Sequence, residues 1–127
     1  MILRGTVNAS VEARIALRLR GPNGVLAGVD ALVDTGYSGA LSLPMRVVDQ
    51  LGLHQGRGGV ITLADGSSTT YVSFGVEVEW LGVYRRVAAA AFSDDAVIGM
   101  GLLSGHALMI EATVGGAVTV VPLMNAL

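Results

Sequence analysis

The sequence predicts an all-β protein. From Val11 to Arg20, apolar residues at odd positions alternate with charged residues at most even positions, which is the period of two of a half-buried strand. Glycine, proline, asparagine and aspartate recur between the apolar runs, as they do in turns. Only 14% of the 127 residues are charged and 52% are hydrophobic. These features indicate one domain over residues 1–127 with a large core.

The first predicted element is a β-hairpin that ends at an acidic residue. Its first strand is the alternating segment Val11 to Arg20, and Gly21-Pro22-Asn23-Gly24 carries strong turn signals. Val25 to Val33 then resumes an apolar strand. This second strand leads directly into Asp34.

The rest of the chain is expected to be strands with two short helices. Pro44 suits the first position of a helix that Gly52 would end. Asp65-Gly66 is a strong hairpin signal, and Gly115-Gly116 marks the last hairpin. We expect a helix over residues 44–51, strands over 60–63, 71–80, 83–92, 96–98, 108–113 and 117–121, and one or two helical turns from residue 100.

Charge and composition exclude several classes of protein. A net charge of −2 gives no positive surface for nucleic acid or an anionic membrane. Residues 112–127, the longest uncharged stretch, are interrupted by glycine and proline and fall short of the roughly 20 apolar residues of a spanning helix. Arg4 interrupts the start of the chain, so no secretory leader is predicted. We expect a cytoplasmic protein with no nucleic-acid and no membrane partner.

No metal or other cofactor is predicted. The chain has no cysteine, and its two histidines, His54 and His106, lie in different motifs without metal-ligand spacing. Ser38 and Ser42 suggest a serine hydrolase, but no nucleophile-elbow motif surrounds them and no histidine lies nearby in sequence.

Asp34-Thr35-Gly36 is the segment whose residue types are most suited to catalysis. Asp34 follows Leu32 and Val33, so an ionisable carboxylate stands at the mouth of a buried strand. Thr35 adds a hydroxyl, and Gly36 permits backbone geometry that a Cβ would forbid. The same residue types are common in turns, so the tripeptide alone also fits a capped turn without chemistry.

Three motifs in order along the chain resemble those of one protein family. Asp34-Thr35-Gly36-Tyr37-Ser38-Gly39 is followed by Leu63-Ala64-Asp65-Gly66 and then by Val97-Ile98-Gly99. This order is similar to that of the small, single-lobed bacterial members of the retropepsin-like aspartic peptidase family, over about Val25 to about Val121. The resemblance implies a closed, barrel-like β lobe with one or two short helices that functions as a symmetric homodimer.

The resemblance also implies which residues act. Asp34 and its symmetry mate would share one proton and activate a water that hydrolyses a peptide bond. Thr35 would lock the two loops together across the interface, and Gly36 would let hydrogen-bond donors approach the carboxylates. The catalytic residues are therefore expected to be Asp34, Thr35 and Gly36.

Further site residues are expected around this loop. Tyr37 stands where two-lobed members carry Ser or Thr and retroviral members carry Ala, so its ring is expected to line the pocket or pack beneath it. The remaining assignments are a substrate-binding flap at Ala64, Asp65 and Gly66, and structural support of the catalytic loop by Val97, Ile98 and Gly99.

The sequence therefore predicts an aspartic endopeptidase that acts on polypeptides with apolar residues around the cut. Two alternatives stay open: a catalytically inactive module that keeps the fold and the dimer and binds peptides, and a structural β domain in which Asp34 only caps a turn. The low charge suggests that part of the surface is buried against another copy. Either Met1 to Thr6 or Thr119 to Leu123 is expected to extend the dimer sheet, as chain ends do in retroviral relatives.

Overall fold

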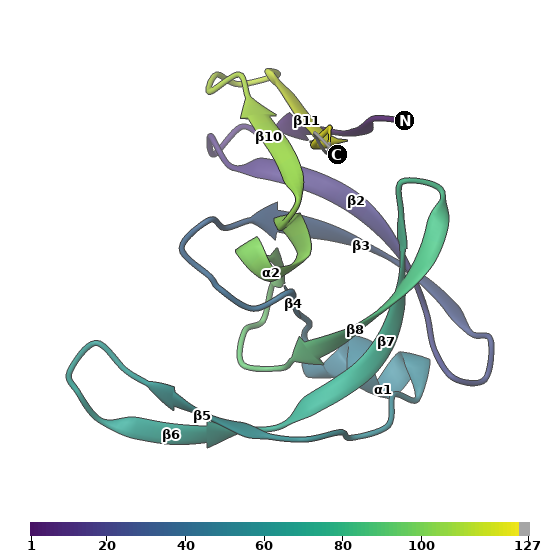
Figure 1. Cartoon of the computed structure of the whole chain (residues 1–127), viewed down its shortest axis with the longest axis vertical. Helices are drawn as coiled ribbons and strands as arrows, with labels where there is room; N and C mark the ends of the chain where they lie inside the picture. Colours follow the sequence, from purple (N-terminus) through teal and green to yellow (C-terminus); the bar gives the residue numbers. More distant parts are fainter. Residues whose placement is uncertain (125–127) are drawn as a thin grey trace.

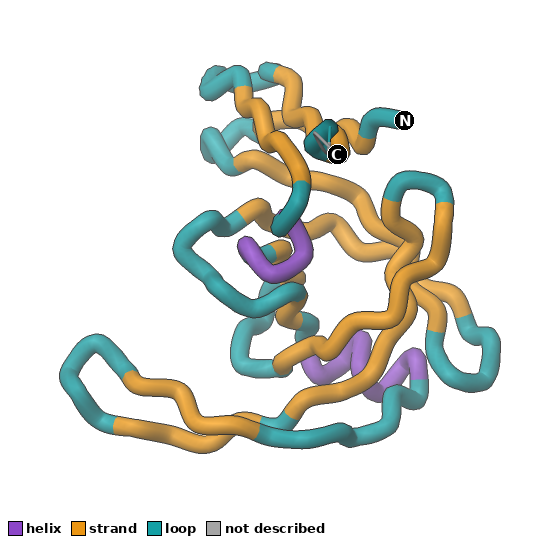
Figure 2. Tube along the Cα trace, in the orientation of Figure 1, coloured by secondary structure: helices purple, strands orange, loops and turns teal. Residues whose placement is uncertain are grey.

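The computed structural model describes residues 1–124 and consists mainly of β-strands (Figures 1 and 2). The strands are β1 (Leu3–Val7), β2 (Ala13–Arg20), β3 (Leu26–Val33), β4 (Leu41–Ser42), β5 (Gly59–Thr62), β6 (Ser68–Tyr71), β7 (Ser73–Trp80), β8 (Val83–Ala90), β9 (Ala96–Ile98), β10 (His106–Ile110) and β11 (Ala117–Pro122). Within these residues there are two helices, α1 (Met45–Leu51) and α2 (Met100–Leu103). The predicted all-β class is confirmed. None of the helices in this part of the chain is long and apolar enough to span a bilayer.

Six strands close into a barrel. The main sheet has the order β10-β11-β1-β2-β3-β9-β4-β8-β7, and β7 also pairs with β2, where Leu19 lies opposite Val78. The barrel therefore contains β2, β3, β9, β4, β8 and β7, and the expected closed, barrel-like lobe is confirmed. β1, β11 and β10 continue the sheet beyond the barrel from β2 (Figure 1).

The barrel interior is filled by the alternating residues that the sequence pattern indicated. On β7 every second residue is buried, namely Phe74, Val76, Val78 and Trp80, whereas Val72 precedes the strand and is exposed. Helix α1 directly follows Pro44 and is followed by Gly52, whose φ of 62° is the left-handed conformation that favours glycine. The helix packs against the core through Val47, Val48 and Leu51.

The predicted strand over residues 71–80 is wrong in its first part. β6 and β7 are separate strands, because Val72 interrupts them and β6 pairs with β5 in a two-stranded sheet of its own. The hairpin of β5 and β6 projects from the barrel (Figure 1). β6 has the sequence Ser-Thr-Thr-Tyr, which lacks the alternation of apolar and polar residues by which strands are recognised.

The first and last strands, β1 and β11, both lie inside the main sheet. β1 pairs with β11 on one edge and with β2 on the other, and β11 lies between β10 and β1. The edges of both segments proposed for the dimer sheet, Met1 to Thr6 and Thr119 to Leu123, are therefore largely occupied within the chain. The outermost strand at this end of the sheet is β10.

Candidate active site

Asp34 lies where β3 leaves the barrel. Its N–H donates to the Ile98 carbonyl at 2.9 Å, which continues the parallel pairing of β3 with β9. The Gly36 N–H donates to Asp34 Oδ1 at 2.9 Å, so the tripeptide forms the tight turn that its composition favours. Asp34, Thr35 and Gly36 are all exposed. The turn thus presents a solvent-accessible carboxylate at a fixed place.

The loop after this turn is held backbone to backbone by the segment that follows β9. The Met100 N–H donates to the Tyr37 carbonyl at 2.7 Å, and the Gly101 N–H donates to the Gly39 carbonyl at 3.1 Å. A Cβ on Gly99 would overlap the Gly39 carbonyl oxygen and the Tyr37 ring. Only glycine permits so close an approach.

The predicted supporting residues therefore lie against the Asp34 loop. Val97 and Ile98 are buried in β9, opposite Leu32 and Val33 of β3. Gly99 adds a hydrogen bond of 3.1 Å from its N–H to the Ala40 carbonyl.

An ion pair anchors the start of β9 to the barrel. Both terminal nitrogens of Arg14, on β2, donate to the Asp95 carboxylate, at 2.9 and 2.7 Å. Hydrogen bonding to Arg14 lowers the pKa of Asp95, and the same bonds raise the pKa of Arg14. Because Asp95 directly precedes β9, this pair helps to fix the strand beside which Asp34 stands.

A groove of about 930 Å³ opens between the Asp34 loop and the β5–β6 hairpin. Among the described residues that line it, none has a charged side chain. The lining residues are Gly36, Tyr37, Ser38, Gly39, Val60, Thr62, Leu63, Thr69, Tyr71 and Phe92. Three of the six aromatic residues of the chain are among them.

Tyr37 and Phe92 form an aromatic wall in this groove. Their rings meet edge to face, with centroids 5.5 Å apart and an interplanar angle of 84°. Partial burial raises the pKa of the Tyr37 hydroxyl. Phe92 is 52% exposed, so its ring contributes more to the groove than to the core.

The predicted flap residues lie at the tip of the β5–β6 hairpin. Ala64, Asp65 and Gly66 form the turn, and the Ser67 N–H donates to Asp65 Oδ1 at 2.9 Å. The hydrogen bond from the Ser67 hydroxyl, together with that from the Ser67 N–H, lowers the pKa of Asp65. The tip residues do not line the groove, which contacts the strands of the hairpin instead.

Sequence reasoning therefore missed several groove residues. Val60, Thr62, Thr69 and Phe92 were not selected, because their role depends on contacts between segments far apart in the chain. For Phe92 the sequence does contain a signal. This aromatic residue stands between a run of alanines and the Ser93-Asp94-Asp95 turn, where its ring is not expected to find a buried partner to pack against.

Neither histidine lines the groove. His106 Nε2 accepts a hydrogen bond from the Trp80 indole at 3.1 Å, and His106 Nδ1 lies 2.9 Å from the Ser104 carbonyl oxygen. His54 is exposed between α1 and β5. In residues 1–124 no three His, Asp or Glu side chains are grouped as metal ligands.

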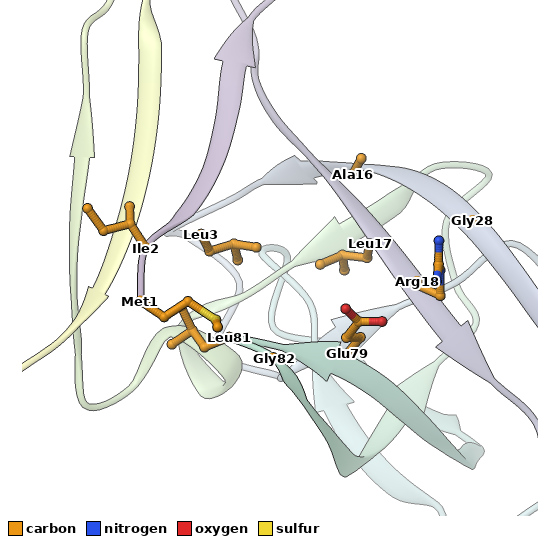
Figure 3. Close-up of a pocket in the computed structure, with 10 residues that line it drawn as sticks. All are labelled: Met1, Ile2, Leu3, Ala16, Leu17, Arg18, Gly28, Glu79, Leu81 and Gly82. Atoms are coloured by element: carbon orange, nitrogen blue, oxygen red, sulfur yellow. The ribbon is translucent and has the colours of Figure 1, made fainter.

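A second hollow, of about 550 Å³, contains none of the predicted site residues (Figure 3). It lies between the N-terminal segment, the middle of β2 and the turn from β7 to β8, and its charged lining residues are Arg18 and Glu79.

Comparison with known proteins supports the fold. No protein-family model and no curated protein matches the sequence. A retropepsin-like aspartic protease from Rickettsia conorii matches the structure with a TM-score of 0.63 and 16% identity, over 94% of this chain and 89% of that one. EIAV protease complexed with an inhibitor matches with a TM-score of 0.53 and 19% identity, over 77% of this chain and 90% of that one. The chain therefore has a retropepsin-like fold.

Proposed function

We propose that this chain is one subunit of a homodimeric aspartic endopeptidase. The observation that carries the proposal is the exposed Asp34 carboxylate in an Asp-Thr-Gly turn whose Gly36 lines a groove, in a retropepsin-like fold. The chain contains one such turn. Since aspartic-peptidase chemistry uses two carboxylates, the second is Asp34 of another copy.

In the proposed reaction the two Asp34 carboxylates hold one proton between them. The ionised carboxylate takes a proton from a water molecule, and the oxygen of that water bonds to the carbonyl carbon of the peptide. The protonated carboxyl group gives its proton to the carbonyl oxygen. The carboxyl group that took the proton from water then gives it to the amide nitrogen as the C–N bond breaks, and a hydroxyl of the tetrahedral intermediate returns its proton to the other carboxylate. One water is consumed, and a carboxylic acid and an amine are released.

Thr35 and Gly36 are proposed to support this carboxylate pair. Thr35 is exposed beside Asp34, and its hydroxyl is proposed to bond to the backbone of the partner loop. A Cβ on Gly36 would lie 3.2 Å from Asp34 Oδ1, tighter than an ordinary contact, so glycine leaves the room that the hydrogen bond to Asp34 needs. Val97, Ile98 and Gly99 hold the loop in place.

The proposed substrate is an extended polypeptide lying in the groove. The β5–β6 hairpin would cover it, with Ala64, Asp65 and Gly66 at the closing tip. The uncharged lining and the wall of Tyr37 and Phe92 favour bulky apolar or aromatic side chains near the cut. The reaction needs no metal or cofactor, and the cytoplasm is the compartment that the cysteine-free sequence suits.

The test is to incubate the protein with a diverse peptide mixture between about pH 3 and pH 8 and to identify new termini by mass spectrometry. Asp34→Asn is expected to abolish cleavage, whereas Asp49→Asn, at an exposed acid on α1, is expected to retain it. The specific rate is expected to fall on dilution, because the dimer dissociates. A folded dimer that binds peptides without cleaving any would be the inactive module, and cleavage independent of Asp34 would contradict the proposal.

A further inference from the structure

We infer that His106 is a positioning residue of the proposed active site: its neutral ring connects the end of α2 to the barrel, and protonation of the ring breaks this connection. The inference rests on the proposed function, because α2 begins with amides that hold the Asp34 loop. It goes beyond that function by assigning a pH-sensitive contact to a residue outside the groove.

The half-buried His106 ring joins three elements of the fold. It stands at the start of β10, and the Trp80 indole at the end of β7 donates to its Nε2 at 3.1 Å. The two rings also meet edge to face, with centroids 5.5 Å apart. On the other side of the ring, Nδ1 lies 2.9 Å from the Ser104 carbonyl oxygen and 3.2 Å from that of Leu103, at the end of α2.

The partners of the ring determine where its proton lies. The Trp80 indole has an N–H and no acceptor, so His106 Nε2 must offer its lone pair. The carbonyl oxygens of Leu103 and Ser104 only accept, so Nδ1 must carry the proton. Only the neutral ring with its proton on Nδ1 satisfies both sides.

A second proton would set two donors against each other. On Nε2 it would face the Trp80 N–H, and Trp80 is 3% exposed, so the indole would lose its acceptor away from water. A buried donor without an acceptor is costly, so the two rings would separate. A free histidine side chain takes up this proton at about pH 6.5, within the pH range of the peptide assay.

The elements around the ring bring few charged groups. α2 reads Met-Gly-Leu-Leu, β10 His-Ala-Leu-Met-Ile and β11 Ala-Val-Thr-Val-Val-Pro, so His106 is the one titratable residue in these three elements. Glu79 and Tyr84 lie opposite each other on β7 and β8, and the alternation of the strands places both on the face away from Trp80. β1, beyond β11, contributes Arg4 and follows the α-amino group. The contacts of the ring are therefore with uncharged groups.

The helix that the ring holds also holds the Asp34 loop. α2 has a single turn, and it leads into β10 (Figure 1). At its start, the Met100 and Gly101 amides donate to carbonyls of the Asp34 loop at 2.7 and 3.1 Å. At its end, the Leu103 carbonyl faces His106. Because the two contacts are one helical turn apart, a shift at the His106 end displaces the amides that fix the loop.

The first test identifies the tautomer by NMR of histidine labelled with nitrogen-15, at roughly pH 8. We expect the His106 proton on Nδ1, although a free imidazole favours Nε2. His54 is exposed and serves as the reference for a ring that is not held. A His106 ring protonated on Nε2 would overturn the inference.

The second test uses the fluorescence of Trp80, the single tryptophan of the chain. Between roughly pH 8 and pH 4 its emission is expected to change with the uptake of one proton. His106→Gln, which keeps an acceptor for the indole but does not titrate, is expected to lose this step, and the matched control His54→Gln is expected to retain it. A step that persists in His106→Gln, or no step in the wild type, overturns the inference.

The link to the Asp34 loop has its own measurement. The amide chemical shifts of Met100 and Gly101 are expected to change over the same pH range as the Trp80 emission, and to stay constant in His106→Gln. Amide shifts that do not follow the emission would show that the His106 contact is only local, which overturns its positioning role.

Peptide cleavage then measures the effect on the proposed reaction. His106→Leu keeps an apolar side chain but neither hydrogen bond, so kcat/KM is expected to fall by about tenfold, whereas His106→Gln restores it at about pH 7. From about pH 7 to pH 5, the ratio of the Gln variant to the wild type is expected to rise by roughly threefold or more, because only the wild-type ring takes up a proton. An unchanged ratio contradicts the positioning role, since a residue that only supports folding would not change the pH profile. Circular dichroism checks that the variants fold.

The outcomes separate this inference from the proposed function. The tautomer, the Trp80 emission and the amide shifts require no activity, so they decide on the His106 contact even if no peptide is cleaved and the peptidase proposal fails. Conversely, Asp34-dependent cleavage by a protein whose emission and amide shifts ignore His106 overturns this inference and leaves the proposed function standing.

Discussion

The two walls of the groove are built in different ways. The Asp34 loop is tied into the barrel, because its backbone pairs with β9 and with the start of α2 at distances of 2.7 to 3.1 Å. The β5–β6 hairpin forms a two-stranded sheet outside the main sheet, and residues 62–70 are all exposed. One wall is therefore part of the folded core, and the other is held mainly by its own ladder and turn.

The two walls would therefore have different tasks: one positions the Asp34 carboxylate, and the other controls access to the groove. In the proposed peptidase the Asp34 carboxylate has to be held in place, and the buried β9 and the glycine contacts would provide this support. A two-stranded hairpin is marginally stable by itself, so the β5–β6 hairpin opens at a lower free energy than the barrel. In the proposed function, such a hairpin would admit a polypeptide and close over it without disturbing the loop. The predictions below change one wall at a time.

Among these substitutions Gly99→Ala is expected to have the largest effect, because it disrupts the wall formed by the Asp34 loop. The new Cβ would overlap the Gly39 carbonyl oxygen and the Tyr37 ring, so the loop must move. We expect the free energy of unfolding to fall by about 3 kcal/mol, as for an overpacked core. In the folded fraction, kcat/KM is expected to fall by roughly 100-fold, because the carboxylate is displaced. Urea unfolding and the peptide assay measure the two effects.

The matched control is Gly28→Ala on β3. The nearest atom to a Cβ there is the Leu17 carbonyl oxygen at 4.0 Å, so the added methyl group has room. We expect the free energy of unfolding to change by less than about 0.5 kcal/mol. Equal losses at Gly28 and Gly99 would show that the contact between Gly99 and the loop is not what matters.

The two walls also differ in how well the sequence predicts them. The barrel strands could be predicted because their alternation reflects burial on one face, as at Ile15, Leu17 and Leu19. β6 could not, since a polar strand exposed on both faces leaves no such pattern. The Asp34 turn was found from its motif. The placement of Phe92 in the groove and the closure of the barrel by β2 and β7 depend on contacts that no local pattern records.

Phe92→Ala tests whether the aromatic wall of the groove selects the substrate. The substitution removes half of the aromatic pair with Tyr37, and Phe92 is mostly outside the core. We expect kcat/KM for peptides with an aromatic residue near the cut to fall by about tenfold, with smaller losses for aliphatic ones. The free energy of unfolding is expected to fall by less than about 1 kcal/mol. Val83→Ala, at a 66% exposed position outside the groove, is the control and should leave the preference among peptides unchanged.

Asp95→Asn tests whether the wall formed by the Asp34 loop depends on the ion pair of Asp95 with Arg14 on β2. The substitution removes the charge that Arg14 holds through two hydrogen bonds. Because the Asp95 side chain is 40% exposed, solvent screens the pair, and we expect a loss of about 1 kcal/mol in the free energy of unfolding at pH 7.

The dependence of this loss on pH has a definite sign. Arg14 lowers the pKa of Asp95 in the folded state, so the pair stabilises the protein above the unfolded carboxyl pKa of about 3.9 and ceases to do so as the pH falls through the lower folded value. The difference between wild type and Asp95→Asn should therefore shrink below about pH 4 in urea titrations. Asp94→Asn, one residue earlier, is the control. A difference that stays constant down to pH 2 would contradict the role of the charge.

Asp65→Ala is expected to have the smallest effect, because it changes only the projecting wall. Asp65 orders the tip of the β5–β6 hairpin by accepting hydrogen bonds from the Ser67 N–H and hydroxyl. Without them, the amide protons of β5 and β6 should exchange faster with deuterium, while those of the Asp34 loop and the denaturation midpoint stay unchanged. We expect kcat/KM to fall by less than about fivefold. Asp65→Asn keeps the acceptor oxygen and should behave like wild type, which separates the hydrogen bond from the charge. Faster exchange at the Tyr37 and Met100 amides in Asp65→Ala would instead mean that the two walls are one cooperative unit, and that access and positioning are coupled.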